Sequence, residues 1–154
     1  MYFDLKTYFE KEAVRLQKHD LILTKTVNQN GESEKKDIKI ADWKSEFAFF
    51  TASDINKPAW RKGYRVIKIG NQLTYLSQDN GLRTKKIEVY SDSQGIVKRI
   101  SIFNKTSNLL YTSTEELQYF PDSIYTINKQ QKVLLNGMNT YQIKSEFKNA
   151  ASNK

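Results

Sequence analysis

The fold is decided by residues 64–104, which read YRVIKIGNQLTYLSQDNGLRTKKIEVYSDSQGIVKRISIFN. Short runs rich in β-branched and aromatic residues alternate here with polar turns at 71–72, 79–81 and 92–95, the last two of which contain glycine. Such short connections join antiparallel neighbours, because a parallel crossover needs a dozen or more residues. The stretch therefore predicts an antiparallel meander with strands at 64–69, 73–77, 82–90 and 96–104.

Similar patterns extend the meander on both sides. Downstream strands are expected at 109–114, 124–133 and 140–147, with Asn136-Gly137 supplying the positive φ angles of a tight hairpin. Upstream, 20–27 and 33–40 are expected to pair around the polar turn at 28–32. A sheet of about seven to nine antiparallel strands does not stay flat, so a strongly curved sheet is expected, its concave side filled by helices or by a ligand.

Two helices are expected before the meander. Residues 2–18 carry Leu5, Phe9, Ala13 and Leu16 at helical spacing, which indicates an amphipathic surface helix. A short second helix begins after Asp42, whose carboxylate suits an N-cap, and ends before Pro58. The sequence thus predicts an α+β fold dominated by β, forming one domain over residues 1–148 with a loose tail at 149–154.

The composition excludes several classes of site. The 154 residues include no cysteine, which rules out disulfides, thiolate metal sites and cysteine nucleophiles. No apolar run approaches the ~20 residues needed to span a bilayer, and the first residues show no signal-peptide pattern. An exported protein is often expressed without its leader, so cytoplasm and periplasm both stay open. No cofactor is indicated.

The positive charge is concentrated in the middle of the chain. Residues 55–105 carry eleven basic and three acidic groups, whereas the segments before and after are nearly balanced. Such a concentration attracts anions, nucleic acid or acidic lipid headgroups when it forms one face. The alternative is that Lys and Arg decorate the solvent faces and edges of strands, where they oppose aggregation.

The most distinctive segment is 53–65, SDINKPAWRKGYR, in which basic residues interleave with Trp60 and Tyr64. Aromatic rings stack on bases or sugars while Lys and Arg contact phosphates or carboxylates. The candidate ligand-binding residues are Lys57, Trp60, Arg61, Lys62, Tyr64, Arg65 and Lys68. The favoured structural alternative is a helix-to-sheet linker in which Trp60 anchors the bend in the core.

Catalytic chemistry has little support in the sequence. His19, the single histidine, falls at a helix end, where the helix dipole favours a solvent-facing imidazole. The carboxylate pairs Glu115-Glu116 and Glu32 with Glu34 have the residue types for acid-base chemistry. However, adjacent strand residues point to opposite faces, and the second pair lies in a polar hairpin. No nucleophile elbow, phosphate-binding loop or metal motif is found.

Four segments together resemble an uncharacterised family of Bacteroidota lipoproteins: residues 3–17, the motif DINKPAW at 54–60, TSNLLY at 106–111 and YFPD at 119–122. The resemblance covers nearly the whole chain. It implies export, a lipidated cysteine upstream of residue 1, and a location in the periplasm or at the outer-membrane surface. The expected shape also resembles half-barrel lipoprotein carriers. The resemblance brings no active site or substrate.

Three functional hypotheses follow. The leading one is a non-enzymatic, exported binding or assembly domain whose partner is a protein, a glycan or an apolar small molecule. Membrane association is then expected only through an upstream lipid anchor. The second is a basic-patch protein that binds anions or nucleic acid, although no nucleic-acid-binding signature supports it. The third is a hydrolase that acts through carboxylates.

Overall fold

The computed structural model describes residues 1–148, so the tail expected at 149–154 lies outside the described residues. Nine strands and a few short helices follow one another along the chain. In chain order they are α1 (Leu5–Gln17), β1 (Leu23–Gln29), β2 (Glu32–Ile38), α2 (Trp43–Glu46), α3 (Ala48–Thr51), the 3-10 helix η1 (Pro58–Trp60), β3 (Tyr64–Ile69), β4 (Gln72–Ser77), β5 (Thr84–Ser91), β6 (Val97–Ser107), β7 (Tyr111–Phe120), β8 (Ile124–Val133) and β9 (Gly137–Phe147).

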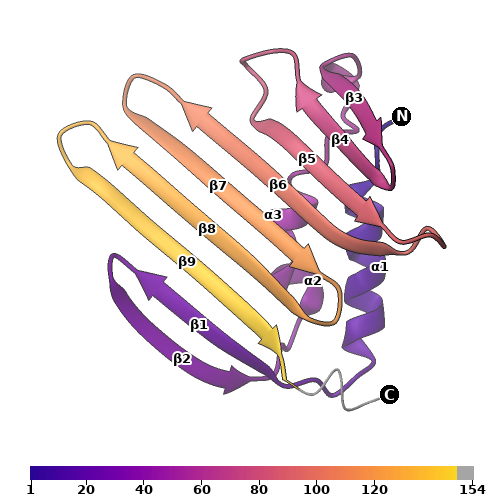
Figure 1. Cartoon of the computed structure of the whole chain (residues 1–154). Coiled ribbons are helices and arrows are strands. Elements are labelled where there is room, and N and C mark those ends of the chain that lie inside the picture. Colours follow the sequence, from indigo (N-terminus) through magenta and orange to yellow (C-terminus); the bar gives the residue numbers. More distant parts are fainter. Residues whose placement is uncertain (149–154) are drawn as a thin grey trace.

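All nine strands form one open antiparallel sheet in the order β2-β1-β9-β8-β7-β6-β5-β4-β3 (Figure 1). Strands β3 to β9 are a meander, in which each strand pairs with the next along the chain. The β1–β2 hairpin joins the meander by pairing β1 with β9, Leu23 opposite Phe147 and Gln29 opposite Tyr141. This non-local contact brings the first strand of the chain beside the last.

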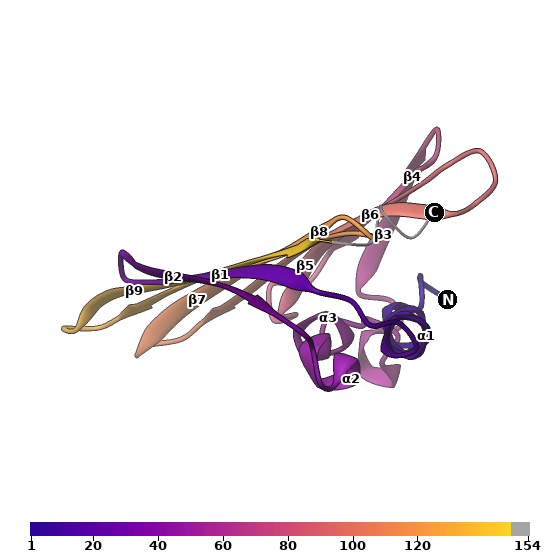
Figure 2. The same ribbon diagram turned by 90° about the horizontal axis from the view of Figure 1, so that it is seen from below.

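The helices pack on one side of the sheet only (Figure 2). Helix α1 buries Leu5, Phe9, Ala13 and Leu16, the apolar stripe expected from the sequence. Aromatic rings fill the space between helices and sheet: Phe9 lies 4.7 Å from Phe50 and 5.0 Å from Tyr119, measured between ring centroids. Such ring contacts add to the gain from burying apolar area, and they lock the helices onto the sheet.

Local sequence explains where the helices and turns fall. Asp4 and Asp42 cap α1 and α2, their carboxylates accepting backbone N–H bonds that the helix leaves unpaired. The β1–β2 turn places Asn30 and Gly31 at φ angles of 51° and 91°. In the β8–β9 turn Gly137 has the expected positive φ of 81°, and the second left-handed residue is Leu135 rather than Asn136.

The α+β class, the early hairpin and the antiparallel meander are confirmed, with nine strands in the sheet in total. The expected second helix is two single-turn helices, α2 and α3, that meet at Phe47. Several strands are longer than expected. β7 continues to Phe120 through a segment under the helices in which buried Glu115, Leu117 and Tyr119 alternate with exposed Glu116 and Gln118. β9 begins at Gly137, and its first residues are exposed and lack the apolar alternation that core packing imposes.

Candidate functional site

The distinctive basic segment forms η1 and the bend that leads into β3. Trp60 is partly buried against the core, and the Nζ atom of Lys57 lies 4.2 Å from the centroid of its ring. Trp60 is thus only partly buried, whereas the favoured prediction was that it anchors the bend in the core. The tryptophan that fills the core is Trp43, 2% exposed and stacked on Phe147 with ring centroids 5.8 Å apart.

The candidate residues after Trp60 do not share one surface. Tyr64 is buried and its hydroxyl donates to the backbone oxygen of Thr84 at 2.7 Å; this burial raises the pKa of the phenol. Because successive strand residues alternate between faces, Arg65 points away from the helices, whereas Lys68 lies on the same face as Tyr64. Lys57, Arg61 and Lys62 are exposed on the loop. The structure therefore divides the basic candidates among a loop and two sheet faces.

A shallow hollow of about 300 Å³ does lie beside this loop. Its lining residues are Met1, Tyr2, Asn56, Lys57, Pro58 and Arg61. The amide of Asn56 donates to the backbone oxygens of Tyr2 and Phe3 at 3.1 Å, and the Tyr2 hydroxyl donates to the oxygen of Arg61 at 2.6 Å. These bonds tie the start of the chain to the loop, which gives the DINKPAW motif a structural role.

Of the two carboxylate pairs considered for catalysis, Glu115 and Glu116 project from opposite faces of the sheet, as expected. Glu115 is buried on the helix-facing side, where its Oε1 atom accepts hydrogen bonds from Arg83 at 2.6 Å and Asn104 at 3.2 Å. Glu116 is exposed on the opposite face. Glu32 and Glu34 lie exposed on β2, and His19 is exposed just past the end of α1. Of these groups, Glu116 lines a depression together with a second carboxylate, that of Glu88.

Within residues 1–148, no helix covers the face of the sheet that is turned away from α1, α2 and α3 (Figure 2). We call it the open face. Strand alternation determines which residues lie on it. Ile87, Ile102 and Leu117 are buried under the helices, so the residues that precede and follow each of them along its strand project from the open face. Across the central strands the outward residues form two neighbouring rows. They are Lys86, Phe103, Glu116 and Asn128 in one row, and Glu88, Ser101, Gln118 and Thr126 in the other.

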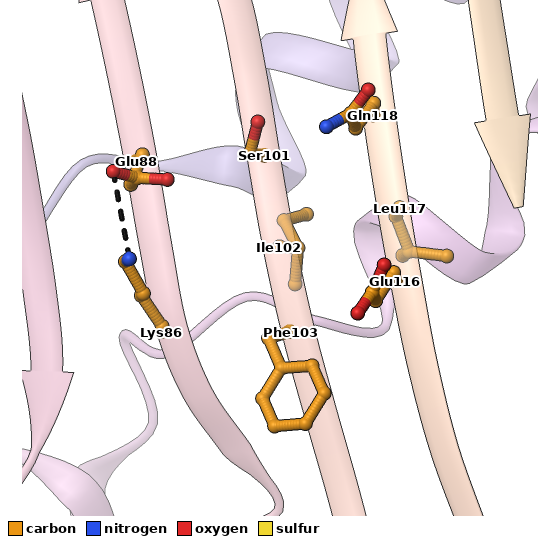
Figure 3. A pocket seen from close by; sticks show the side chains of 8 residues that line it. All are labelled: Lys86, Glu88, Ser101, Ile102, Phe103, Glu116, Leu117 and Gln118. Atoms are coloured by element: carbon orange, nitrogen blue, oxygen red, sulfur yellow. Dashed lines mark ion pairs between the residues drawn. The ribbon is translucent and has the colours of Figure 1, made fainter. Parts of the chain in front are cut away.

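A depression of about 290 Å³ lies on this face over β5, β6 and β7 (Figure 3). Its outward lining is Lys86, Glu88, Ser101, Phe103, Glu116 and Gln118, while Ile102 and Leu117 contribute to its floor. Lys86 lies 3.7 Å from Glu88, whose carboxylate also accepts from the Gln72 amide at 3.0 Å. Glu116 is exposed beside Phe103, and Gln118 is exposed beside Ser101 at the other end of the depression.

This arrangement combines one aromatic ring with hydroxyl, amide and carboxylate groups on a rigid sheet. A rigid surface with a few convergent polar groups around an apolar patch is a typical small recognition site. These residues were not among the candidate ligand-binding residues predicted from the sequence. The alternation of Ser101 and Phe103 with Ile102 and Asn104 in SIFN, 101–104, does indicate that Ser101 and Phe103 share one face of a strand. Alternation alone does not indicate that this face is left uncovered by other elements.

Within residues 1–148, no helix has the length and apolar character needed to cross a membrane. The same residues contain no group of three or more His, Cys, Asp or Glu side chains placed to hold a metal ion. Comparison of the chain with models of protein families, with curated proteins and with solved structures finds no match.

Proposed function

We propose that this chain is a non-enzymatic binding or assembly domain that recognises a glycan on the open face of its sheet. The observation that carries the proposal is the depression over β5–β7, where Phe103 lies between Lys86 and Glu116 on a face that no helix within residues 1–148 covers (Figure 3). A sheet held by helices on its other side is a rigid platform, and preorganised side chains lose little entropy on binding.

The side chains suit a sugar. An aromatic ring offers a flat apolar surface on which the C–H face of a pyranose can pack, and Phe103 is the ring at this position. Glu116 accepts hydrogen bonds, while Gln118 both donates and accepts them, as vicinal hydroxyls require. Further hydroxyl and amide groups continue the row on β8 as Thr126 and Asn128. An extended polar chain can therefore run across several strands.

The alternatives receive less support from the geometry. An apolar small molecule would need a cavity between helices and sheet, but Phe9, Phe47, Phe50, Tyr119 and Tyr125 contact one another in that layer. An anion or nucleic acid would need the basic residues on one face, and Arg65 and Lys68 project from opposite faces. A hydrolase would need two buried carboxyls facing a cleft. Glu88 and Glu116 line the same depression, but Glu88 is bound by Lys86 and Gln72 and Glu116 is exposed.

The proposed location is the periplasm or the outer-membrane surface, which is the part of the proposal that the motif resemblance motivates. It is tested separately by fractionating cells that produce the full gene product. Recovery in the soluble cytoplasmic fraction, with no processed or lipidated form, would contradict the location and leave the glycan proposal intact.

The glycan proposal is tested with a panel of immobilised oligosaccharides, followed by calorimetric titration of each soluble oligosaccharide that is retained. We expect binding by the native chain and a decrease in affinity of at least tenfold in Phe103→Ala and Gln118→Ala. Thr26→Ala, on the open face of β1 far from the depression, is the matched control and should bind normally. Retention of no glycan, or equal affinity in Phe103→Ala with an unchanged melting temperature, would contradict the proposal.

A further inference from the structure

Two neighbouring hairpin ends carry five of the twelve large apolar side chains that are exposed within residues 1–148. Leu109 and Leu110 form the β6–β7 turn, 94% and 67% exposed, and Leu134 and Leu135 form the β8–β9 turn, 63% and 95% exposed. Met138, at the start of β9, is 57% exposed. We call these five residues the apolar tips. Contiguous exposed apolar groups in a folded domain mark a surface that contacts something else.

The two turns lie side by side and are ordered by hydrogen bonds. The N–H of Leu134 donates to the backbone oxygen of Leu110 at 2.9 Å, which joins one turn to the other. The side-chain oxygen of Asn108 accepts from the backbone N–H groups of Leu110 at 2.8 Å and Tyr111 at 3.0 Å. The leucines are therefore presented together on fixed backbone.

The apolar tips also project beyond the turns on either side of them (Figure 1). The β1–β2 turn meets β9 at Thr140, where the N–H of Asn30 donates to the Thr140 oxygen at 3.0 Å. The β4–β5 loop meets β6 at Lys105, whose N–H donates to the Arg83 oxygen at 2.8 Å. Three or four further residues separate these points from the tips, which is about 10 Å of strand.

The charged side chains next to the apolar tips along these strands are all positive. Segments 105–114 and 129–143 contain three lysines, Lys105, Lys129 and Lys132, and no Asp or Glu. Lys129 lies 3.7 Å from the buried Glu115, whereas Lys105 and Lys132 are exposed. Lys132 pairs with Met138, just behind the turn, and Lys105 pairs with Thr114 farther back. The two flanking turns carry acidic residues, Glu32 in the β1–β2 hairpin and Asp79 in the β4–β5 loop, and both turns are recessed as described above.

We propose that the apolar tips insert into the interfacial region of a lipid bilayer that contains anionic lipid. Leucines at the end of the molecule would enter the boundary between headgroups and acyl chains, a layer of roughly 5–10 Å for interfacial anchors, and the lysines behind them would meet the headgroup phosphates. Tyr111, partly buried beside the turn, falls at the level where amphipathic rings favour the interface.

A bilayer fits this surface better than a second protein. The apolar tips are convex ends of two hairpins, so a rigid partner would touch them over little area, whereas lipid deforms around them. The order along the strands, apolar first and cationic behind, matches the order of a bilayer from its core outward. This contact uses the hairpin ends and leaves the open-face depression free, so it stands independently of the glycan proposal.

The proposal is tested by co-sedimentation with vesicles of phosphatidylcholine alone and of phosphatidylcholine with phosphatidylglycerol. We expect the native chain to sediment with the mixed vesicles and at least tenfold less with phosphatidylcholine alone. The double variant Leu109→Glu/Leu135→Glu should lose binding by at least tenfold. Ile69→Glu, which replaces a 75% exposed isoleucine on β3, is the matched control and should bind as the native chain does.

Two further measurements separate insertion from simple charge attraction. The chain has no cysteine, so Leu135→Cys and Ile69→Cys can each carry one environment-sensitive fluorophore. Label at position 135 should shift to the blue on mixed vesicles, and label at position 69 should not. Lys105→Gln/Lys132→Gln should weaken binding several-fold and reduce its salt dependence.

Three results would overturn the proposal. One is equal sedimentation of the double leucine variant and the native chain. Another is the absence of a spectral shift at position 135. The third is self-association of the native chain that is lost in the leucine variant while neither binds vesicles, which would assign the apolar tips to contact between two copies.

Discussion

At the scale of single residues, Trp60 shows how one side chain can be partly structural and partly exposed. Its ring packs against the edge of the core, and the ammonium group of Lys57 covers one side at 4.2 Å. The loop that carries it is held by Asn56, whose amide bonds two backbone oxygens near the start of the chain. Trp60 thus contributes to the bend between η1 and β3 without the full burial of Trp43.

We expect Trp60→Ala to lower the free energy of unfolding by about 1–2 kcal/mol, because about half of a full aromatic burial and one cation–π contact are lost. Lys57→Ala removes only the cation and should cost about 0.5 kcal/mol. Urea denaturation of the native chain and both variants measures these differences. A loss above about 3 kcal/mol would indicate a true core anchor, and a loss below about 0.5 kcal/mol would indicate a surface residue.

At the scale of elements, the hairpin ends are governed by different forces from the covered parts of the strands. Under the helices, β6 and β7 alternate buried apolar and exposed polar residues. Past the helices the same strands carry Thr, Ser and Asn, and they are held by backbone pairing and by a hydrogen bond between the hydroxyls of Ser107 and Thr112 at 3.2 Å. Leu135, with a φ of 71°, is a β-turn residue whose side chain makes this conformation unfavourable.

We expect Leu135→Gly to stabilise the fold by about 1 kcal/mol, because glycine adopts a positive φ without the steric cost of a Cβ atom. The same change removes one apolar tip and should weaken binding to anionic vesicles. Thermal melts and vesicle sedimentation of the same preparation test both effects. Leu134→Gly, which removes a neighbouring leucine, is the control for the loss of the side chain, since Leu134 is not among the residues of positive φ. A lower melting temperature in Leu135→Gly would contradict the strain argument.

The elements show which parts of the fold the sequence could predict. Turn chemistry placed the meander and the hairpin at 28–32 correctly, since local φ requirements restrict the residues that fit. The pairing of β1 with β9 was not predicted, because it joins segments more than a hundred residues apart and has no local signal. The depression on the open face was not predicted either, because strand pairing alone brings Lys86, Ser101 and Glu116 together and leaves no local signal in the sequence.

At the scale of the whole molecule, stability depends on one layer of aromatic side chains between helices and sheet. Two of its hydroxyls donate to partly buried carboxylates: Tyr119 to Glu12 at 2.7 Å and Tyr125 to Glu46. Burial is the main cause that raises the pKa of both phenols, and the adjacent carboxylates raise it further. Burial also raises the pKa of Tyr8, Tyr64 and Tyr75.

We therefore expect the protein to lose stability as the pH rises above about 10. Each of these tyrosines titrates near pH 10 when unfolded but keeps its proton to higher pH when folded, so the folded state binds more protons and the free energy of unfolding falls. The stabilisation is complete below pH 10, and each tyrosine contributes a slope of up to about 1.4 kcal/mol per pH unit above it. Urea denaturation between pH 8 and 11 measures that slope.

Tyr119→Phe should lower stability at pH 8, because the hydrogen bond to Glu12 is lost, yet should make the decline above pH 10 less steep. Tyr90→Phe, at a position 41% exposed, should leave the slope unchanged. A native chain whose stability stays constant from pH 8 to 11 would contradict the assignment of these phenols to the buried layer.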